Sequence, residues 1–426
     1  MTRAIHEGQM KNDQFRALTT PIYQTSTYRF ENTQQGIDIF KGEEPGFVYT
    51  RNGNPTIRTL ENKVVALEGG AGAVACASGM GAIASLCWTH LQSGDHIIVG
   101  DCLYGCSDLL IRQSMPKFDI EVSAVDTSNI DAVREAIRPN TKIIFFETPT
   151  NPLMKLTDIS AVSDVARAAN EDILVVVDNT FAPPPIQRPL DCGADMVVHS
   201  ATKYLNGHGD VIGGLIVSKD EKYLPDLRRL GMTKLTGSVM SPFDAYLVIR
   251  GIQTLGLRIE RHCENALKVA RYLQTKGEVA RVYYPGLDET GSTNATEGSA
   301  NPQGANDGNA SPQSASDCAT QQEILKTQMH GLGTGILSFE LQPEIRGKSG
   351  EEAAKIVLDN MQVVHLAVSL GDPFSLIEYP FRMTHIVVPD EVKLASGITP
   401  ELIRFSAGLE DAEDLIADFE QAFARI

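Results

Sequence analysis

From about residue 54 onward, segments with the spacing of a helix alternate with short apolar runs typical of strands. Between residues 56 and 68, apolar side chains recur at 57, 60, 64 and 67, which is the spacing of one helix face. Short, mostly apolar runs follow at 96–99, 142–146, 173–177, 196–199 and 214–217, with helical segments that include 131–137 and 159–169. Strands without polar alternation are typical of a parallel sheet covered by helices on both faces. The pattern therefore predicts an α/β fold.

Breaks in this pattern divide the chain into three predicted parts. Residues 1–53 are polar without a sustained period and predict an extended arm, which needs a surface to lie on, such as that of a partner subunit. Residues 54–255 form the predicted large domain. Residues 256–426 form a smaller C-terminal α/β domain, whose stretch 288–321 is poor in apolar side chains. Such a stretch cannot offset its ordering entropy, so it predicts a flexible surface insertion.

One lysine and one aspartate follow the ends of two predicted strands. Asp178 comes directly after the run 173–177, and Lys203 follows the run 196–199. Ligands of such sheets bind at the carboxyl ends of the strands. Pyridoxal 5′-phosphate needs a lysine amine for a Schiff base and an acid that keeps its pyridine nitrogen protonated. An isolated lysine after a strand is usually a surface residue, but the paired Asp178 and the hydroxyls of Ser200 and Thr202 favour a cofactor site.

Three further candidates carry weaker signals. The segment 77–83 opens a predicted helix with two glycines, and its first amides could face a phosphate together with Ser200 and Thr202. Tyr104 follows the run 96–99 and could stack on a cofactor ring and move a proton, although an isolated tyrosine more often packs. Arg404 lies inside an apolar run, where it suits either a substrate carboxylate or a structural ion pair.

Composition narrows the class of protein. The 426-residue chain has a net charge of −17, so it repels nucleic acid and anionic membranes. Its seven cysteines, an odd number, predict free thiols in a reducing cytosol. Neither a signal peptide nor a run of ~18 apolar residues is present, so a cytoplasmic protein is expected. No metal site is expected, because no second Cys/His pair lies near Cys102 and Cys106. The glycine-rich segments 70–72 and 331–335 do not fit a nicotinamide-dependent oxidoreductase.

The chain resembles the pyridoxal-phosphate enzymes of cysteine and methionine metabolism, the cystathionine γ-synthase-like group. The likeness runs from about Thr19 to the C-terminus and fails only at 288–321. It rests on the motifs Tyr49-Thr-Arg51-x-x-Asn-Pro55-Thr, Ser78-Gly79-Met80, Leu103-Tyr104-Gly105, Glu147-Thr-Pro-Thr-Asn151-Pro152, Val177-Asp178-Asn179-Thr180, Ser200-Ala-Thr202-Lys203-Tyr and Ser369-Leu370-Gly371. The resemblance implies the aspartate aminotransferase-like fold (type I), with a mostly parallel seven-stranded sheet and a smaller C-terminal α/β domain. It also implies a homotetramer made of two catalytic dimers.

Carried over residue by residue, the resemblance assigns cofactor contacts. Lys203 would form the Schiff base and move the Cα proton, and Asp178 would pair with the pyridine nitrogen. The other implied cofactor contacts are Tyr104 on the ring, Gly79, Met80, Ser200 and Thr202 at the phosphate, Asn151 near the phenolic oxygen, and Tyr49 and Arg51 at the phosphate of a neighbouring subunit's cofactor.

For the substrate, the resemblance implies that Ser369 and Arg404 bind the carboxylate of an amino acid. Tyr49 and Cys106 are expected nearby, and Tyr104 is expected to protonate the departing sulfur. Cys106 and the valine before Ser369 favour the subgroup of methionine γ-lyases. The expected reaction is then α,γ-elimination of L-methionine to methanethiol, 2-oxobutanoate and ammonia.

Other activities stay open at this point. Thr233-Lys234 and the insertion depart from the methionine γ-lyase pattern. Cystathionine γ-lyase and the γ-replacement enzymes, cystathionine γ-synthase or O-acetylhomoserine sulfhydrylase, share every catalytic residue named. A non-catalytic binding protein of the same fold is a remote alternative, because Lys203, Asp178 and Arg404 are all intact.

Overall fold

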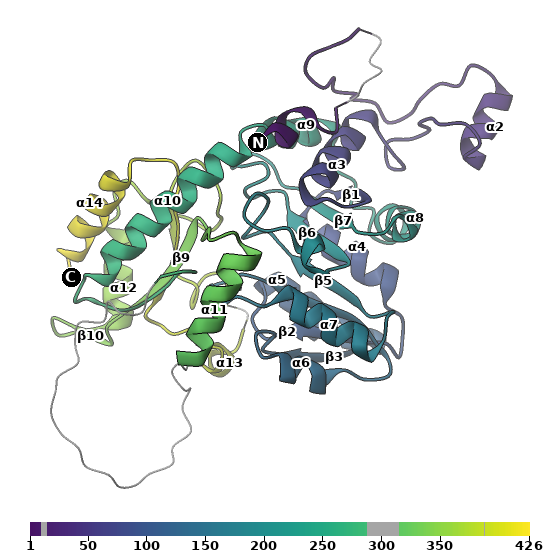
Figure 1. The fold of residues 1–426 in the computed structure, drawn as a ribbon. Helices are drawn as coiled ribbons and strands as arrows, with labels where there is room; N and C mark the ends of the chain where they lie inside the picture. Colours follow the sequence, from purple (N-terminus) through teal and green to yellow (C-terminus); the bar gives the residue numbers. More distant parts are fainter. Residues whose placement is uncertain (10–14, 288–314, 387) are drawn as a thin grey trace. The chain divides into compact units, whose positions relative to one another are not determined.

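The computed structural model describes residues 1–9, 15–287, 315–386 and 388–426 (Figure 1). The chain divides into two compact units. The first unit comprises residues 1–148, 157–260 and 371–373, and the second comprises residues 149–156, 261–370 and 374–426. The change of unit at 260–261 lies close to the domain boundary predicted at 255–256, but the short segments 149–156 and 371–373 each belong to the unit opposite to their neighbours.

A seven-stranded sheet forms the centre of the first unit, in the order β1-β7-β6-β5-β4-β2-β3. Its strands are β1 (Gly72–Cys76), β2 (His96–Gly100), β3 (Glu121–Val125), β4 (Thr141–Glu147), β5 (Leu174–Asp178), β6 (Met196–Ser200) and β7 (Gly214–Ser218). The neighbours from β6 to β3 are parallel, whereas β7 runs antiparallel to both β1 and β6. The predicted seven-stranded, mostly parallel sheet is confirmed.

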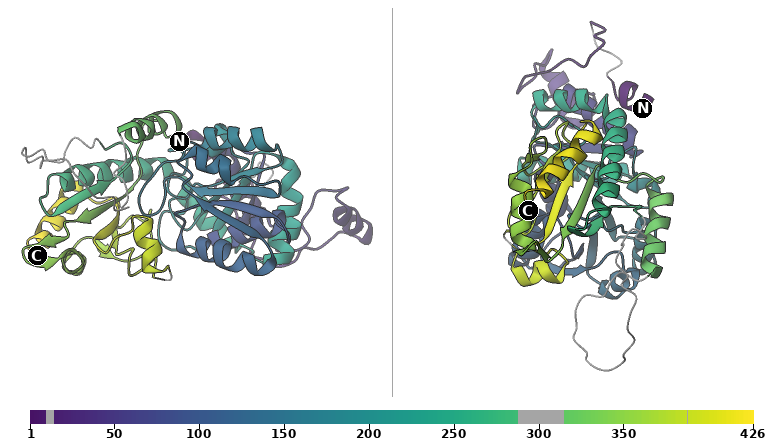
Figure 2. Two further views of the ribbon diagram at one scale, coloured as in Figure 1. Left: turned by 90° about the horizontal axis from the view of Figure 1, so that it is seen from below. Right: turned by 90° about the vertical axis from the view of Figure 1, so that its left-hand side faces the viewer.

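Helices cover both faces of this sheet (Figure 2). On one face, Val176 and Val198 share a core with α4 (Gly79–His90), and on the other, Val175 and Val177 share a core with α7 (Ile159–Ala169). The remaining helices of the first unit's sheet layer are α3 (Pro55–Glu68), α5 (Gly105–Asp108), α6 (Ile130–Ala136), α8 (Leu224–Asp226) and α9 (Pro242–Ile252), with the π-helices η1 (Leu109–Ser114) and η5 (Leu227–Thr236) and the 3₁₀ turns η2 (Met115–Phe118), η3 (Pro189–Cys192) and η4 (Glu221–Tyr223). The strands β2, β4, β5, β6 and β7 are therefore buried on both sides, as their continuous apolar runs predict.

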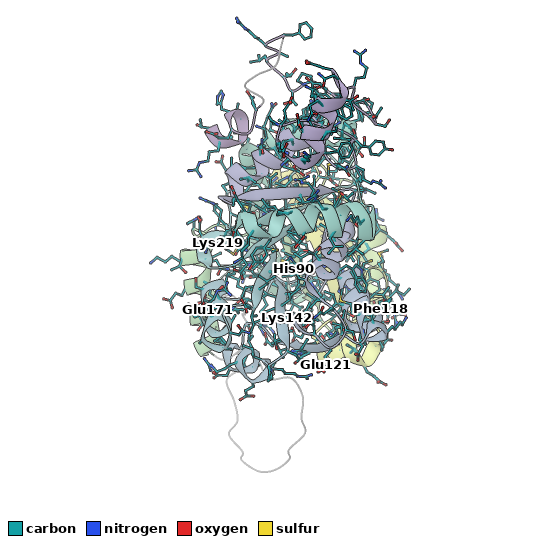
Figure 3. All side chains as sticks on the ribbon, turned by 90° about the vertical axis from the view of Figure 1, so that its right-hand side faces the viewer. His90, Phe118, Glu121, Lys142, Glu171 and Lys219 are labelled. Atoms are coloured by element: carbon teal, nitrogen blue, oxygen red, sulfur yellow. The ribbon has the colours of Figure 1, made fainter. Side chains whose placement is uncertain are left out.

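Strand β3 lies at one edge of the sheet and was not predicted. Its residues are largely exposed or half-buried, and Figure 3 labels Phe118 and Glu121 just before and at its start. Phe118 packs edge-on against Trp88, with ring centroids 5.0 Å apart, while Glu121 is exposed. An edge strand buries too little to show an apolar run. No helix of the described residues is long and apolar enough to span a membrane.

The N-terminal segment is not wholly extended. The short helix α1 (Thr2–His6) is fastened to α3 by the buried Lys63, whose ammonium donates to the carbonyls of Ala4 at 2.9 Å and Glu7 at 3.0 Å. A second helix, α2 (Thr33–Lys41), stands apart from the sheet of the first unit (Figure 1). These two helices interrupt the stretch that the sequence predicts to be an arm.

The second unit is built on a five-stranded sheet, in the order β12-β13-β14-β9-β8. Its strands are β8 (Val279–Tyr283), β9 (Ile336–Leu341), β12 (His365–Leu366), β13 (Leu376–Glu378) and β14 (Leu402–Ser406), and β10 (Glu344–Ile345) and β11 (Lys348–Ser349) form a separate hairpin. The helices are α10 (Leu255–Gln274), which enters from the first unit, α11 (Ala315–Gln328), α12 (Gly350–Asp359), α13 (Asp390–Ala395) and α14 (Ala412–Phe423). The smaller C-terminal α/β domain is thus present.

Of the insertion predicted at 288–321, residues 288–314 lie outside the part of the chain that the structure describes. Its last part, 315–321, belongs to helix α11. The side chain of Gln321 accepts a hydrogen bond from the backbone N–H of Leu156 at 2.7 Å and donates to its carbonyl at 2.8 Å. The polar composition of this helix start hides these specific contacts, which explains why the sequence places it in the loop.

Candidate active site

Three parallel strands end in polar side chains at the same edge of the first unit's sheet. Glu147, Asp178 and Ser200 are the last residues of β4, β5 and β6, and Glu147 is paired in register with Asp178. Lys203 follows within one turn, where its backbone N–H donates to the carbonyl of Ser200 at 3.1 Å. The structure therefore brings together at one edge the aspartate, serine and lysine that the sequence predicts to bind the cofactor.

Thr180 connects Asp178 to Ser200. The carboxylate of Asp178 accepts from the backbone N–H of Thr180 at 3.0 Å and from its hydroxyl at 2.6 Å. The same hydroxyl oxygen accepts from the N–H of Ser200 at 2.8 Å. Removal from water raises the pKa of Asp178, whereas the two bonds from Thr180 and the charge of His199 lower it. A cation bound at Asp178, such as a protonated ring nitrogen, would add to the stabilisation of the charged carboxylate.

The start of α4 lies beside this edge and is a candidate anion site. Ser78 caps the helix and accepts from the N–H of Gly81 at 2.9 Å. The amides of Gly79 and Met80 are the first two of the helix, so they have no acceptor within it. A Cβ atom at residue 79 would lie 3.1 Å from the Cβ of Ser200, so only glycine allows so close an approach without adjustment. Two amides of a first helical turn and a serine hydroxyl beside them fit a phosphate group.

The hydroxyl of Thr202 has partners within its own loop. It accepts from the N–H of Gly213 at 3.0 Å and donates to the carbonyl of the same residue at 3.3 Å. This hydroxyl is therefore engaged by the backbone, and the phosphate contact predicted for Thr202 stays a prediction.

Glu147 holds the backbone of Tyr104. Its buried carboxylate accepts from the N–H of Tyr104 at 2.7 Å. Tyr104 itself is 43 % exposed and precedes α5, in which Cys106 is exposed. The tyrosine ring and the thiol are thus both accessible, at a turn whose backbone is held by the hydrogen bond to Glu147. In the sequence, Glu147 appears only as part of a family motif, without a predicted role of its own.

Tyr49 and Arg51 lie next to each other and are both exposed. The guanidinium carbon of Arg51 is 5.8 Å from the centroid of the Tyr49 ring. The hydroxyl of Thr233 donates to the carbonyl of Arg51 at 3.3 Å. The two side chains are therefore available to a ligand or to another chain.

Within the second unit, Arg404 contacts Ser369, which is predicted to bind the substrate, and Asn151, which is predicted to lie near the cofactor. Its Nη1 donates to Asn151 Oδ1 at 3.1 Å, and its Nη2 donates to the carbonyl of Ser369 at 3.0 Å. The structure also gives Arg404 a counter-charge, because Nη1 lies 2.8 Å from Oε1 of Glu378. Both charged side chains are buried, and the two residues are register partners on β14 and β13.

Glu378 was missed by sequence reasoning. The signal that could have found it is an acid at the end of the apolar run Leu376-Ile-Glu378, since a buried charge requires a partner. The neighbouring His385 is also buried, and burial, reinforced by the charges of Arg404 and Lys393, lowers its pKa to about 4. Near neutral pH this histidine therefore adds no charge to the pair.

Comparison with known proteins agrees with this geometry. The family model of the Cys/Met metabolism PLP-dependent enzymes matches residues 1–304 and 314–424. The chain belongs to this family of pyridoxal-phosphate enzymes, and its cofactor is pyridoxal 5′-phosphate. Both the predicted fold class and the prediction of an enzyme are thereby confirmed.

The relatives carry more than one name. An L-methionine gamma-lyase of Fusobacterium nucleatum subsp. polymorphum is 46 % identical over 425 residues, covering 100 % of this chain and 98 % of its own. A cystathionine gamma-lyase of Bacillus subtilis (strain 168) is 40 % identical over 425 residues, covering 100 % of this chain and 99 % of its own. The crystal structure of cystathionine gamma-lyase from Lactobacillus plantarum complexed with L-serine has a TM-score of 0.85 and is 39 % identical, covering 100 % of this chain and 98 % of that one.

Proposed function

We propose that the protein is a methionine γ-lyase, which converts L-methionine and one water molecule into methanethiol, 2-oxobutanoate and ammonia. The observation that carries this proposal is the exposed thiol of Cys106, two residues after Tyr104 at the start of α5. A soft sulfur beside the proton donor suits a sulfur leaving group. Relatives named L-methionine gamma-lyase that are 40–46 % identical over nearly the whole chain support it.

The named residues divide the work of such an elimination. Bound pyridoxal phosphate supplies the electron sink that makes the Cα proton of an amino acid acidic. The amine of Lys203 holds the cofactor and then carries protons at Cα and Cβ. Asp178 keeps the ring nitrogen protonated, and Tyr104 protonates the departing sulfur. Arg404, with Asn151 and Ser369 around its guanidinium, binds the substrate carboxylate.

The runner-up functions are cystathionine γ-lyase and the γ-replacement enzymes, since the same groups serve all of them. The deciding experiment incubates the purified holoenzyme separately with methionine, cystathionine, cysteine, and O-acetylhomoserine plus sulfide, and quantifies every product. We expect methanethiol and 2-oxobutanoate from methionine at the highest kcat/KM. A higher kcat/KM for cystathionine, or homocysteine as the main product with O-acetylhomoserine and sulfide, would replace the proposal.

Cys106→Ser is expected to change substrate preference. Since serine lacks the polarizable sulfur, kcat/KM for methionine should fall at least ~10-fold more than kcat/KM for an O-substituted homoserine, a difference of about 1.4 kcal/mol in transition-state binding. Cys102→Ser is the matched control, because it changes a thiol in the same segment that is less exposed. Equal losses for both substrates would make Cys106 a packing residue and remove the main support for methionine.

We also propose that the enzyme is a cytoplasmic homotetramer of two catalytic dimers. Large apolar side chains of the N-terminal segment are exposed on the single chain, with Phe15 at 83 %, Leu18 at 89 % and Phe40 at 64 % exposure. Exposed apolar groups of this kind mark a surface that another chain covers. The free thiols among the described residues suit a reducing compartment. Light scattering tests the tetramer and cell fractionation tests the location, and a monomer or a secreted protein would contradict these assignments.

Arg51→Ala is expected to complement Lys203→Ala if Arg51 reaches the cofactor of a neighbouring subunit. Each variant alone has defective sites, but a mixed dimer contains one site in which both groups are intact. Mixing the two variants after dissociation and reassociation should therefore restore part of the activity, at most about a quarter of the wild-type value under random pairing. Hybrid dimers that form without regaining activity would assign Arg51 to the cofactor of its own chain.

A further inference from the structure

A buried carboxylate–imidazole pair lies next to the strand ends that carry Asp178 and Ser200. Oε1 of Glu68, the last residue of α3, is 2.6 Å from Nε2 of His199 in β6, and the two side chains are 0 % and 1 % exposed. Neither residue has a role in the reaction described above. Taking two ionisable groups out of water is costly, so their presence calls for a function.

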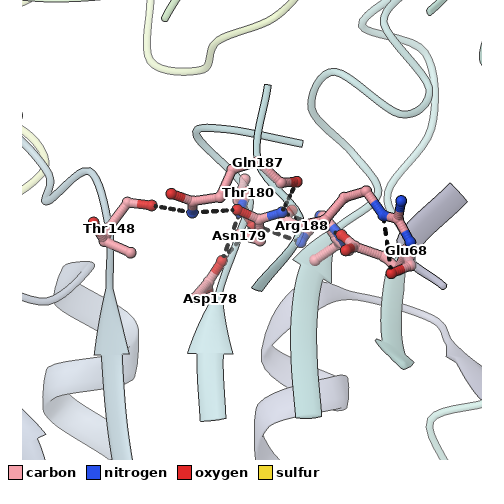
Figure 4. Close-up of polar contacts among 9 residues, drawn as sticks. Glu68, Thr148, Asp178, Asn179, Thr180, Gln187 and Arg188 are labelled. Carbon is pink, nitrogen blue, oxygen red and sulfur yellow. Dashed lines mark hydrogen bonds and ion pairs between the residues drawn. The ribbon is translucent and has the colours of Figure 1, made fainter. Parts of the chain in front are cut away.

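The same carboxylate connects strand ends that carry the proposed catalytic residues (Figure 4). Oε1 of Glu68 also accepts from Nδ2 of Asn179 at 3.1 Å. Asn179 follows Asp178, and His199 precedes Ser200. Because consecutive side chains of a strand point to opposite faces, holding Asn179 and His199 from one face fixes Asp178 and Ser200 on the other.

The network continues to the neighbouring strand end. Nε2 of Gln187 donates to Asn179 Oδ1 at 2.8 Å and to the carbonyl of Thr148 at 3.0 Å. Thr148 directly follows β4. The ends of β4, β5 and β6 are therefore joined by one buried set of hydrogen bonds, in which Glu68 supplies an acidic side chain.

The pair also acts on Asp178 through charge. Burial raises the pKa of Asp178, and the positive charge of His199 opposes that rise. The other charged groups at this place are Arg188, whose Nε donates to the backbone carbonyl of Glu68 at 3.3 Å, and Asp191, which pairs with Arg188 at 3.1 Å. Of these groups, His199 is the one whose charge lowers the pKa of Asp178.

We propose that Glu68 and His199 are positioning residues for the cofactor, which hold Asp178 in the orientation and charge state that bind a protonated ring nitrogen. The inference rests on the role proposed above for Asp178. It assigns to the pair a contribution to cofactor affinity and not only to folding.

The test measures the dissociation constant of pyridoxal phosphate for the apoenzyme across pH, by titration of absorbance and fluorescence. Glu68→Gln keeps the shape of the acid and removes its charge, and His199→Asn retains a donor group and removes the imidazole. Both are expected to weaken cofactor binding about 10-fold, the low end of the effect of an outer-shell partner on a bound group. Losing the charge of His199 raises the pKa of Asp178, so affinity should also begin to fall at a higher pH on the acid side.

The matched control is Glu61→Gln, on the same helix. Glu61 is equally buried, but it pairs with Arg228 at 2.8 Å and accepts from the backbone N–H of Ala75 at 3.0 Å, away from the strand ends. This variant should lower the melting temperature of the apoenzyme and leave the dissociation constant unchanged. If Glu68→Gln does not fold, His199→Asn decides alone.

Asp178→Asn distinguishes the role proposed for Asp178 from the role inferred for Glu68 and His199. If it binds the cofactor as tightly as the wild type, the role proposed for Asp178 is wrong. If Asp178→Asn weakens binding while Glu68→Gln and His199→Asn bind like Glu61→Gln at every pH, the pair serves folding alone and the present inference is overturned.

Discussion

Lys203→Ala is expected to abolish turnover with every substrate. One amine holds the cofactor and moves the proton at Cα, so its loss should lower kcat by at least ~10³-fold, in the upper range for a lost acid–base group. Two backbone hydrogen bonds hold the turn around Lys203. The N–H of Lys203 donates to the carbonyl of Ser200, and the carbonyl of Lys203 accepts from the N–H of Gly207 at 2.7 Å. The fold should therefore survive the substitution.

The measurement combines steady-state kinetics with the visible absorption of the bound cofactor, expected near ~420 nm for a protonated lysine adduct. Lys219→Ala, at an exposed lysine just after β7, is the control and should retain full activity. Wild-type turnover by the Lys203 variant would contradict the proposed roles of Lys203 in holding the cofactor and moving the proton.

Removing Arg404 is expected to damage both stability and catalysis. Arg404→Met leaves the buried Glu378 without its counter-charge, which should lower the free energy of unfolding by about 3–5 kcal/mol. It also removes the proposed carboxylate receptor, so kcat/KM should fall at least ~100-fold, or about 2.7 kcal/mol.

The double variant Arg404→Met/Glu378→Gln separates these effects. Without a buried unpaired charge, it should regain much of the lost stability in a denaturant titration, while its kcat/KM stays low. If the single variant is as stable as the wild type, Glu378 does not depend on Arg404. If the double variant regains activity, Arg404 is a structural residue and another group binds the carboxylate.

The strands that were predicted from sequence are those buried on both faces. The runs that became β2, β4, β5, β6 and β7 are continuous and apolar, and their ends located Asp178, Ser200 and Lys203 correctly. Strand β1 was missed because Gly72-Ala-Val-Ala-Cys76 is short and rich in small residues after a glycine-rich segment, and β3 because an edge strand is only half-buried.

The missed site residues share a different property. Each of them contacts a group that is distant in the sequence or that lies across a turn. They are Glu147, Thr180 and Glu378. Glu147 reaches Tyr104 and Glu378 reaches Arg404, each from a different strand or turn. Such contacts depend on tertiary structure, and no periodicity along the chain encodes them. The family motifs predict which residues bind the cofactor and substrate, but they do not indicate which neighbours hold those residues in place.

The pairing of Arg404 with Glu378 affects how a substrate arrives. A carboxylate that approaches this arginine meets an ion pair without net charge, in a chain whose own charge is −17. Long-range attraction to this pair would therefore contribute little to the encounter. If Arg404 binds the substrate as proposed, selection of the amino acid would take place at contact, through the direction of the remaining N–H groups of the guanidinium.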